Sequence, residues 1–245
     1  VLANGMSLRA SFDHPVLTSN GWVWMRDLKE GDLVAVARTI PEPTKLTAAT
    51  DEEVLFAAYL LADGGVSTDH TVFCDDNQKV TAKVRNLSAA LASGTGYERA
   101  RGGATEEFNI RGAAAFRQKW NIHGLSKHKR VPASFWGLPR RQIALFLNRF
   151  WACDGYHNKG KGFETTLASE KLIDDLQFML LRLGIKGRKR FKVAKIKGKQ
   201  FDAWRLSVTG EDAIRFYETV GPIFGVELRS TALYEELKSL KRNTN

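Results

Sequence analysis

Two aspartates, Asp63 and Asp154, each end a strongly apolar stretch, and each is followed by glycine. The two stretches are Val54 to Ala62 and Gln142 to Cys153. A capping box at residues 50–53 (TDEE) precedes the first stretch and predicts that a helix begins there. Helices that are apolar almost all round are buried, so we expect these two to lie side by side in the centre of the protein. Their ends would bring two carboxylates together. Paired carboxylates without zinc-type ligands suit hard, oxygen-preferring divalent cations such as Mg²⁺.

The two aspartates stand 91 positions apart, from 63 to 154, and the segments that follow them match as well. In each copy a second helical pattern leads into a strand-like hairpin and then into a final helical stretch. The helical patterns end at Gly94 and Gly184, the hairpins run from Gly96 to Ile110 and from Ile185 to Val208, and the final helical stretches lie near 112–120 and 211–220. The order αββαββα, used twice, predicts an α+β fold with repeats at 50–139 and 140–245.

Composition narrows the class of protein. The 245 residues include 43% hydrophobic ones, which excludes a disordered chain, and 37 Lys+Arg against 27 Asp+Glu give a net charge of +10. The longest apolar run, nine residues, is too short to span a membrane, and the first residues lack the order of a signal peptide. Cys74 and Cys153 form no CxxC pair, so we expect a reducing, cytoplasmic location, nucleoid-associated if the source is bacterial.

The positive charge is concentrated in one window. Residues 186–199 hold eight basic side chains and no acidic one. Within it Arg188, Arg190 and Lys192 alternate with Lys189, Phe191 and Val193, as in a half-buried strand with one basic face. Such a patch attracts a polyanion such as nucleic acid, and the alternative is a solvated, charged hairpin.

These features resemble the LAGLIDADG homing endonucleases, in the single-chain, two-repeat form carried inside inteins. The nine-letter motif of that family maps onto residues 56–64 (FAAYLLADG) and 147–155 (LNRFWACDG). The small residue at its third position, which lets the helices approach closely, is Ala58 in the first copy and Arg149 in the second. The resemblance implies a monomer with internal pseudo-twofold symmetry and saddle-shaped antiparallel sheets around the central helix pair. It also implies that Asp63 and Asp154 hold Mg²⁺, with Mn²⁺ or, in a non-cleaving complex, Ca²⁺ as substitutes.

A third catalytic residue follows from the same resemblance. Lys129-Arg-Val-Pro132 matches the Lys-x-apolar-Pro block of intein endonucleases, whose lysine lies at the active site. The corresponding stretch of the other copy, residues 225–229, has no lysine, and Arg229 is a possible second-site cation. Lys129 would stabilise developing charge or orient water, and the two strands would be cut at unequal rates. The alternative is that Lys129 is a solvated residue in the basic run 127–130.

The family binds double-stranded DNA through its β-hairpins, which enter the major groove on either side of the helix pair. Because the two hairpins here differ in charge, the resemblance implies an asymmetric target site and cleavage of both strands. The expected DNA-binding residues are Arg99, Arg101, Arg111, Lys159, Lys161, Arg188, Arg190, Lys192, Lys195, Lys197, Lys199 and Arg205.

Residues 1–43 resemble part of the splicing (Hint-like) region of an intein, which implies a small all-β segment. Ser11 and His14 match the block that supplies the histidine of protein splicing, and strands are expected at 16–18, 22–24 and 33–36. The chain begins at Val1 and ends in Asn245 without a preceding histidine, so we expect the splicing machinery to be incomplete.

Three other functions stay open. A DNA-binding protein of the same fold that no longer cuts, as some maturases and LAGLIDADG-like regulators are, would explain the missing second lysine. A splicing-active intein fragment is the second, and an unrelated RNA-binding enzyme is the third. The third is disfavoured because the chain has no glycine-rich phosphate loop and no zinc-finger spacing. The histidines at 70, 123, 128 and 157 are expected to be ordinary surface or phosphate-proximal residues.

Overall fold

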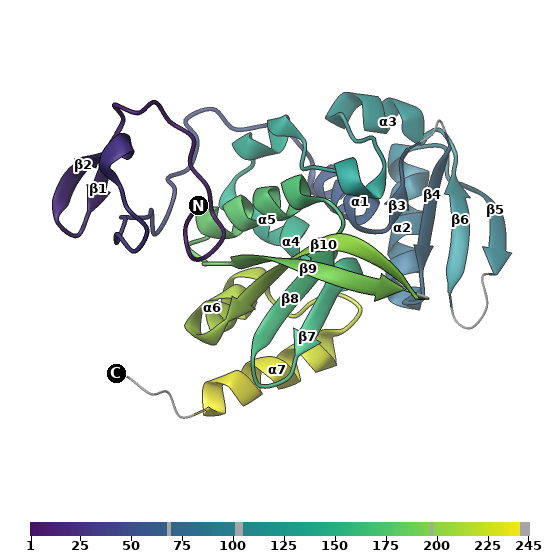
Figure 1. Ribbon diagram of the computed structural model, residues 1–245. Helices are drawn as coiled ribbons and strands as arrows, with labels where there is room; N and C mark the ends of the chain where they lie inside the picture. Colours follow the sequence, from purple (N-terminus) through teal and green to yellow (C-terminus); the bar gives the residue numbers. More distant parts are fainter. Residues whose placement is uncertain (68–69, 101–104, 197, 241–245) are drawn as a thin grey trace.

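The same order of elements occurs twice along the chain. The computed structural model describes residues 1–67, 70–100, 105–196 and 198–240 (Figure 1). The first repeat comprises α1 (Asp51–Ala62), β3 (Gly64–Gly65), β4 (Thr71–Asp75), α2 (Gln78–Leu91), β5 (Thr95–Ala100), β6 (Glu106–Ile110) and α3 (Ala113–Trp120). The second comprises α4 (Arg140–Asp154), β7 (Gly155–Asn158), β8 (Gly162–Leu167), α5 (Glu170–Arg182), β9 (Arg188–Ile196), β10 (Lys199–Thr209) and α6 (Gly210–Val220). The predicted αββαββα order is confirmed.

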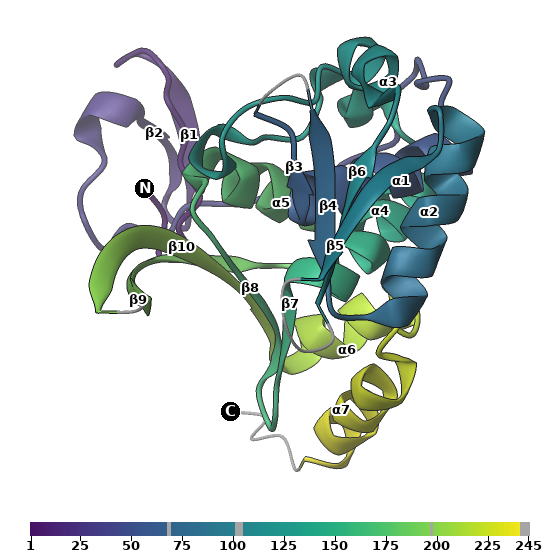
Figure 2. The same ribbon diagram turned by 90° about the vertical axis from the view of Figure 1, so that its right-hand side faces the viewer.

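Each repeat builds one four-stranded antiparallel sheet, and both sheets have the same topology. The strand order is β3-β4-β6-β5 in the first and β7-β8-β10-β9 in the second. In Figure 2 the second sheet lies to the left of the first, α1 and α4 lie behind the first sheet, and the β9–β10 hairpin extends to the left. The two copies are unequal, because the β9–β10 hairpin pairs from Arg188 opposite Ser207 to Ile196 opposite Lys199, whereas β5 and β6 are shorter.

The helix pair is buried as its apolar pattern predicts. The capping box at the start of α1 forms, with the Glu53 N–H donating to Thr50 Oγ1 at 3.2 Å and the Thr50 N–H donating to Glu53 Oε2 at 3.0 Å. From Val54 to Leu61 every residue of α1 is buried, and on α4 Phe146, Leu147, Phe150 and Trp151 are inaccessible to solvent. The two helices pack directly against one another.

The glycine of each Asp-Gly pair has a steric role. A Cβ atom on Gly64 would lie 2.5 Å from the carbonyl oxygen of Leu60, and one on Gly155 would lie 2.2 Å from that of Trp151. Both distances are shorter than atoms can approach, so only glycine lets the chain leave each helix directly into a strand. This close approach fixes the aspartates at the helix ends beside β3 and β7.

Arg149 is accommodated without separating the helices. Its guanidinium lies over the ring of Phe224, 4.3 Å from the centroid, and donates to Asn148 Oδ1. Ala58 on the facing helix is fully buried. The side chain therefore leaves the crossing toward the segment after α6, and burial lowers the pKa of its guanidinium.

Three further elements lie outside the repeated order. The short 3₁₀ turns η2 (Ser126–His128) and η3 (Ala133–Gly137) connect α3 to α4. A final helix, α7 (Glu227–Ser239), packs against α6, β7 and β8 and was not predicted. None of the helices in the described ranges is long and apolar enough to cross a membrane.

The N-terminal segment is less regular than the predicted all-β region. Strands β1 (Pro15–Thr18) and β2 (Gly21–Trp24) form a hairpin followed by η1 (Met25–Asp27), but the strand expected at 33–36 is absent there. Only one isolated bridge joins Thr18 to Val34. The prediction was wrong because Leu33 and Val36 remain exposed, so alternating apolar residues have no second layer to pack against.

Polar contacts hold this segment on the second repeat. The Lys189 N–H donates to the carbonyl of Asn4 at 2.9 Å. The guanidinium of Arg182, which is 2% exposed, pairs with Glu42 at 3.2 Å, and Glu42 also accepts the backbone N–H of Arg140 at 2.9 Å. Ser11 and His14 are exposed in a turn closed by the His14 N–H donating to the Ser11 carbonyl at 3.1 Å.

Candidate functional site

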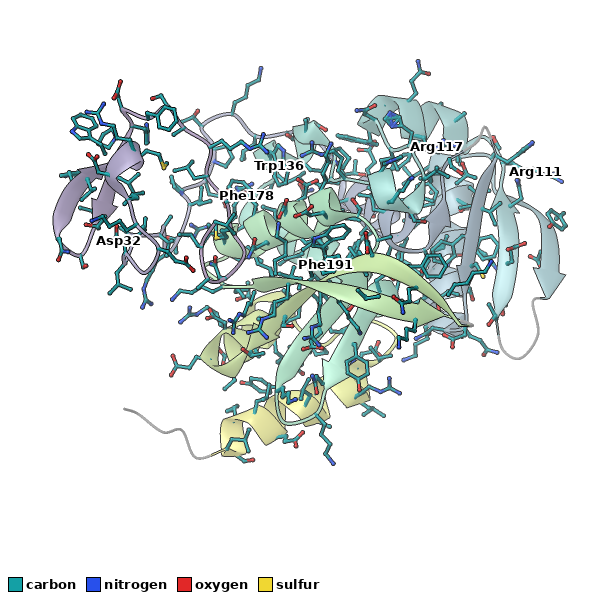
Figure 3. All side chains as sticks on the ribbon, viewed as in Figure 1. Asp32, Arg111, Arg117, Trp136, Phe178 and Phe191 are labelled. Carbon is teal, nitrogen blue, oxygen red and sulfur yellow. The ribbon has the colours of Figure 1, made fainter. Side chains whose placement is uncertain are left out.

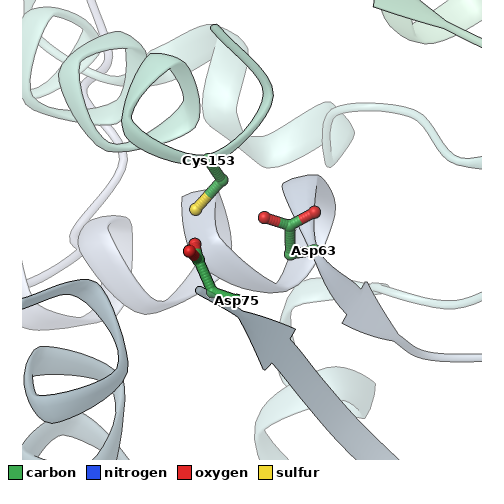
Figure 4. Close-up of side chains that lie close together, drawn as sticks. All are labelled: Asp63, Asp75 and Cys153. Atoms are coloured by element: carbon green, nitrogen blue, oxygen red, sulfur yellow. The ribbon is translucent and has the colours of Figure 1, made fainter. Parts of the chain in front are cut away.

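Two carboxylates and a thiol meet at the ends of the central helices (Figure 4). Asp63 ends α1, Asp75 ends β4, and Cys153 lies in the last turn of α4. One oxygen of each carboxylate and the Sγ atom of Cys153 all lie within 4.8 Å of one another. Asp75 Oδ1 accepts the backbone N–H of Asn77 at 2.8 Å. Its Oδ2 is buried and has no hydrogen-bond partner among the described residues.

The electrostatics of this cluster disfavour negative charge. Burial raises the pKa of Asp63, and the neighbouring carboxylates of Asp154 and Asp75 raise it further. Burial likewise raises the pKa of Asp75, and it raises that of the Cys153 thiol well above its ordinary value. The Cys153 thiol is directed towards the carboxylates of Asp63 and Asp75, and its contact with them offsets part of the rise in their pKa values. Several half-buried acidic groups whose charges are only partly compensated form a site that a divalent cation would stabilise.

Asp154 occupies the last position of α4, next to this cluster. Burial raises the pKa of its carboxyl, Asp75 adds to the rise, and the Lys129 ammonium opposes it. Among the residues that the structure describes, however, the close group of ligand atoms consists of Asp63, Asp75 and Cys153, and Asp154 is not part of it. The two predicted aspartates thus lie close enough to interact through charge, but only Asp63 belongs to the group of ligand atoms, together with Asp75 and Cys153.

Lys129 is buried at the end of the first helix rather than solvated. Its Nζ donates to the carbonyl oxygens of Leu60, Leu61 and Ala62 at 3.2, 2.9 and 3.0 Å, and the residue is 5% exposed. An ammonium has three N–H donors, and a cation is favourable at the carboxyl end of a helix. Burial lowers the pKa of Lys129, while Asp154 and Asp63 raise it in part. Lys129 therefore acts on both aspartates through its charge and anchors the end of α1.

An open cavity of about 440 Å³ gives access to this centre. Its lining residues come from the end of α1, from the first sheet and from the η2 loop: Ala62, Asp63, Gly64, Gly65, Val72, Cys74, Glu107, Ser126 and Lys129. A reacting group on this side of the molecule would approach Asp63 and Lys129 together.

The donor set fits a divalent cation with one exception. Carboxylates of Asp63 and Asp75, with the orphaned Oδ2 of Asp75, are the oxygen ligands that Mg²⁺ and Mn²⁺ take. Cys153 is the exception, because a thiol is a poor ligand for a hard cation and a good one for a soft cation.

The predicted second-site cation lies elsewhere. Arg229, on α7, is exposed and lines a separate cavity of about 650 Å³ with His157 and Lys159. His157 is half-buried against the ring of Phe163, at 5.6 Å between centroids, and burial followed by the charge of Arg229 lowers its pKa to about 4. His157 was expected to be an ordinary surface or phosphate-proximal residue, and the structure shows it half-buried instead of fully exposed, because α7 packs against β7 at this point.

The basic hairpin presents one charged face. Arg188, Arg190 and Lys192 of β9 are exposed, and Arg190 lies directly opposite Arg205 of β10. Lys189 points to the other face, where it pairs with Glu170 at 3.1 Å and with Asp174. Like charges directly opposite on a sheet are destabilising, and Glu164, 3.8 Å from Arg205, offsets only part of this. The predicted alternation is confirmed for this part of β9.

The opposite face of the hairpin is only partly covered. Phe191 packs edge to face on Trp204 at 5.6 Å, yet it is 57% exposed and Val193 is 45% exposed (Figure 3). By register Lys195 shares this face with Phe191, so it is not part of the row Arg188, Arg190 and Lys192. The β9–β10 hairpin extends beyond α5, the helix that covers its base, so the half-buried pattern ends partway along β9.

The other predicted DNA-binding residues are dispersed. Lys159 and Lys161 are exposed in the turn between β7 and β8, and Lys199 is exposed at the start of β10. Arg111 follows β6 and is exposed at the end of the first sheet (Figure 3). The backbone of Arg99 pairs with Glu107 in the first sheet, while Arg101 and Lys197 lie outside the described residues.

Comparison with known proteins agrees with this architecture. Residues 141–221 match the family described as LAGLIDADG-like domain. Full-length DUF199/WhiA from Thermatoga maritima superposes with a TM-score of 0.53 at 13% identity, covering 85% of this chain and 66% of that one. I-DmoI in complex with DNA and Ca superposes with a TM-score of 0.52 at 12% identity, covering 76% and 97%. At such low identities these superpositions establish the fold alone, which is that of LAGLIDADG proteins.

Sequence relatives cover nearly all of this chain. It is 27% identical over 259 residues to the replicative DNA helicase DnaB of Synechocystis sp. (strain ATCC 27184 / PCC 6803 / Kazusa), which covers 96% of this chain and 29% of the relative. It is 28% identical to DnaB of Rhodothermus marinus, over 98% of this chain and 28% of that protein. The replication factor C small subunit of Methanocaldococcus jannaschii is 26% identical over 98% of this chain and 13% of its own length. The chain thus spans less than a third of these relatives.

Two members of the cluster, Asp75 and Cys153, were not singled out from the sequence. Asp75 lies 12 positions after Asp63, and only the pairing of β3 with β4 returns the end of β4 to the end of α1. Cys153 immediately precedes Asp154 inside the second motif, where its apolar neighbours favour a core residue. For Asp75 the sequence did offer a signal, which is the acidic pair Asp75-Asp76 directly before the Asn77 cap of α2.

Proposed function

We propose that the chain is a site-specific DNA endonuclease of the homing type, which binds an asymmetric duplex site and cuts both strands with a divalent cation. The observation that carries this proposal is the half-buried centre in which Asp63, Asp75, Asp154 and Lys129 gather at the ends of the paired helices. These carboxylates lie close together at a cost to the stability of the fold, and they stand beside an open cavity and two sheets. Groups with such perturbed pKa values are typical of catalytic sites, so the arrangement suits phosphodiester hydrolysis better than a structural role.

In this mechanism the residues of the chain position and neutralise the reacting groups. A divalent cation held by Asp63 and Asp75, with Asp154 beside them, would activate water and stabilise the leaving oxygen. The three donors of Lys129 are engaged with the end of α1, so its contribution is positive charge at a fixed place and not a hydrogen bond to water. The exposed row Arg188, Arg190 and Lys192 would neutralise DNA phosphates and read base edges. Similarity to I-DmoI, solved in complex with DNA and Ca, supports the DNA partner.

The pattern of relatives supports an intein origin. One segment covers nearly all of this chain but under a third of a helicase and about an eighth of a replication factor subunit. Host proteins with different names that share one segment are expected when that segment is an inserted element. We propose accordingly that residues 50–139 and 140–245 are the two endonuclease halves and that residues 1–43 are a splicing remnant.

One observation favours a second function, a DNA-binding protein of this fold that does not cut. Arg229 lines a different cavity from Asp63 and Lys129, so residues 225–229 of the second half place no cation that corresponds to Lys129 beside Asp63. The similarity in fold to DUF199/WhiA is compatible with this alternative.

A cleavage-site selection separates the two functions. The protein is incubated with a randomised duplex library in Mg²⁺ or Mn²⁺, and cut ends are captured and sequenced, with EDTA as the control. We expect one long, non-palindromic sequence to be recovered in metal and none in EDTA. Recovery of a bound but uncut sequence under every metal condition would establish the non-cleaving function instead.

Removing the charged row should weaken DNA binding in a salt-dependent way. A variant carrying Arg188→Ala, Arg190→Ala and Lys192→Ala should bind less tightly, and the slope of log K against log salt should fall by up to about 2.7, because each phosphate contact contributes about 0.9. A matched variant carrying Lys29→Ala, Arg38→Ala and Lys45→Ala removes the same charge from exposed N-terminal positions. Equal losses in both variants would mean that overall charge, not this row, determines binding.

A further inference from the structure

The thiol of Cys153 does not match the hard cation that the fold implies. Cys153 Sγ lies in the same group of ligand atoms as the Asp63 and Asp75 oxygens, all within 4.8 Å (Figure 4). A buried serine or alanine would serve a Mg²⁺ site without introducing a soft ligand. Cys74, by contrast, lines the open cavity on β4 and does not belong to this group.

The three donors come from three separate elements and converge on one point. They are the end of α1, the end of β4 and the last turn of α4, each fixed by the packing of the helix pair and the first sheet. The buried Oδ2 of Asp75 has no hydrogen-bond partner among the described residues, so one oxygen is available to a cation. Asp63 also lines the open cavity of about 440 Å³. Two carboxylates and one sulfur are the ligand number of a Zn²⁺ site that keeps an exchangeable position, and all three are atoms that bind Zn²⁺.

We propose that Asp63, Asp75 and Cys153 form a site for a thiophilic divalent cation, Zn²⁺ or Cd²⁺, which binds more tightly than Mg²⁺ and blocks cleavage. On binding, the S–H bond of Cys153 breaks, a metal–sulfur bond forms and the proton passes to solvent. The metal-binding part stands on the geometry alone, and the inhibitory part rests on the proposed nuclease function. Free zinc would then act as a negative regulator of the same centre.

Cadmium titration of the DNA-free protein tests the binding directly. Thiolate-to-Cd²⁺ charge transfer gives an ultraviolet absorption band, which we expect to saturate at one Cd²⁺ per chain and to persist in a large excess of Mg²⁺. Cys153→Ser should remove the band and raise the Kd for Cd²⁺ by about 100-fold or more, since even the partners behind a ligand contribute roughly 10- to 100-fold. Cys74→Ser is the matched control and should keep the band.

Several outcomes would overturn the site. They are a band that survives in Cys153→Ser, a band that is lost in Cys74→Ser, and the absence of any saturable band in the unaltered protein. Near-ultraviolet circular dichroism checks that each variant is folded. If Cys153→Ser does not fold, Asp75→Asn provides the test, because it keeps the sulfur band but should weaken Cd²⁺ binding by about tenfold or more.

Inhibition by Zn²⁺ is measured separately, as the rate at which the target DNA is cut. With Mg²⁺ as the cofactor, micromolar Zn²⁺ should stop the unaltered protein and Cys74→Ser, while Cys153→Ser should keep most of whatever activity it shows without Zn²⁺. Equal inhibition of Cys153→Ser would refute regulation through this thiol. A protein that binds Cd²⁺ through Cys153 but cuts no DNA under any condition would retain the metal site and lose the nuclease function, so the two failures are distinguishable.

Discussion

Asp63→Asn and Asp154→Asn are each expected to abolish double-strand cleavage while leaving DNA affinity nearly unchanged. Each substitution keeps the size of the side chain and removes one negative charge from the buried centre, so a cation there loses a ligand or a neighbouring countercharge. The charged row on β9 and the rest of both sheets are untouched. Cleavage should fall by several orders of magnitude, whereas a fall in binding would imply a structural effect.

Stability measurements separate the loss of chemistry from a loss of folding. Because burial raises the pKa of both aspartates in the folded protein, their ionised forms destabilise it above their unfolded pKa values, and this cost disappears when the side chain is neutral. The midpoint of thermal unfolding of each Asn variant should therefore match or exceed that of the unaltered protein. Asp76→Asn, an exposed neighbour of Asp75, is the matched control and should cut normally.

The cleavage and unfolding measurements together also show whether each aspartate serves one DNA strand. Full cleavage by either Asn variant would refute the assignment of the active site. Persistent nicking of one strand by a single variant would show instead that each aspartate serves one strand. An unfolding midpoint that falls sharply in both variants would mean that the carboxylates hold the helix ends together, as a structural pair would.

The repeated part of the fold could be predicted from the sequence because its signals are local. Apolar residues all round two helices, an Asp-Gly pair at the end of each, and matching spacing through the following hairpins determine the order of elements. Strand pairing within each hairpin then leaves few alternatives for the sheet. The same local signals failed at 33–36, where an alternating apolar pattern has no second layer to cover it.

The candidate site was predictable only where the motif itself supplies the residue. Asp63, Asp154 and Lys129 were singled out from motifs, but the proximity of Asp75 to Asp63 depends on the pairing of β3 with β4, which brings the end of one strand back to the helix end. The role of Lys129 was likewise hidden, because three carbonyl partners on α1 lie 67 to 69 positions away in sequence. Tertiary placement of this kind has no local sequence signal.

Lys129→Ala should slow the first cut of a supercoiled target plasmid by about 100-fold or more, the size typical of removing one preorganised electrostatic group. The substitution removes the cation that interacts with both Asp154 and Asp63 and leaves the carbonyls of Leu60, Leu61 and Ala62 without their donor. Its matched control is Lys127→Ala, an exposed lysine of the same loop, which should cut at the rate of the unaltered protein.

The same plasmid time course reports on the two strands separately. Because the Lys129 ammonium donates to the end of α1 and Arg229 lines a different cavity, the unaltered protein should accumulate nicked circles before linear product. Direct conversion to linear DNA would show that one lysine serves both cuts equally. If Lys129 has only a structural role, Lys129→Ala should lower both the unfolding midpoint and the DNA affinity. If Lys129 acts in catalysis, the variant should keep its DNA affinity but cut more slowly at saturating protein. A normal cutting rate in a folded Lys129→Ala variant would leave Lys129 as the cap of α1 and nothing more.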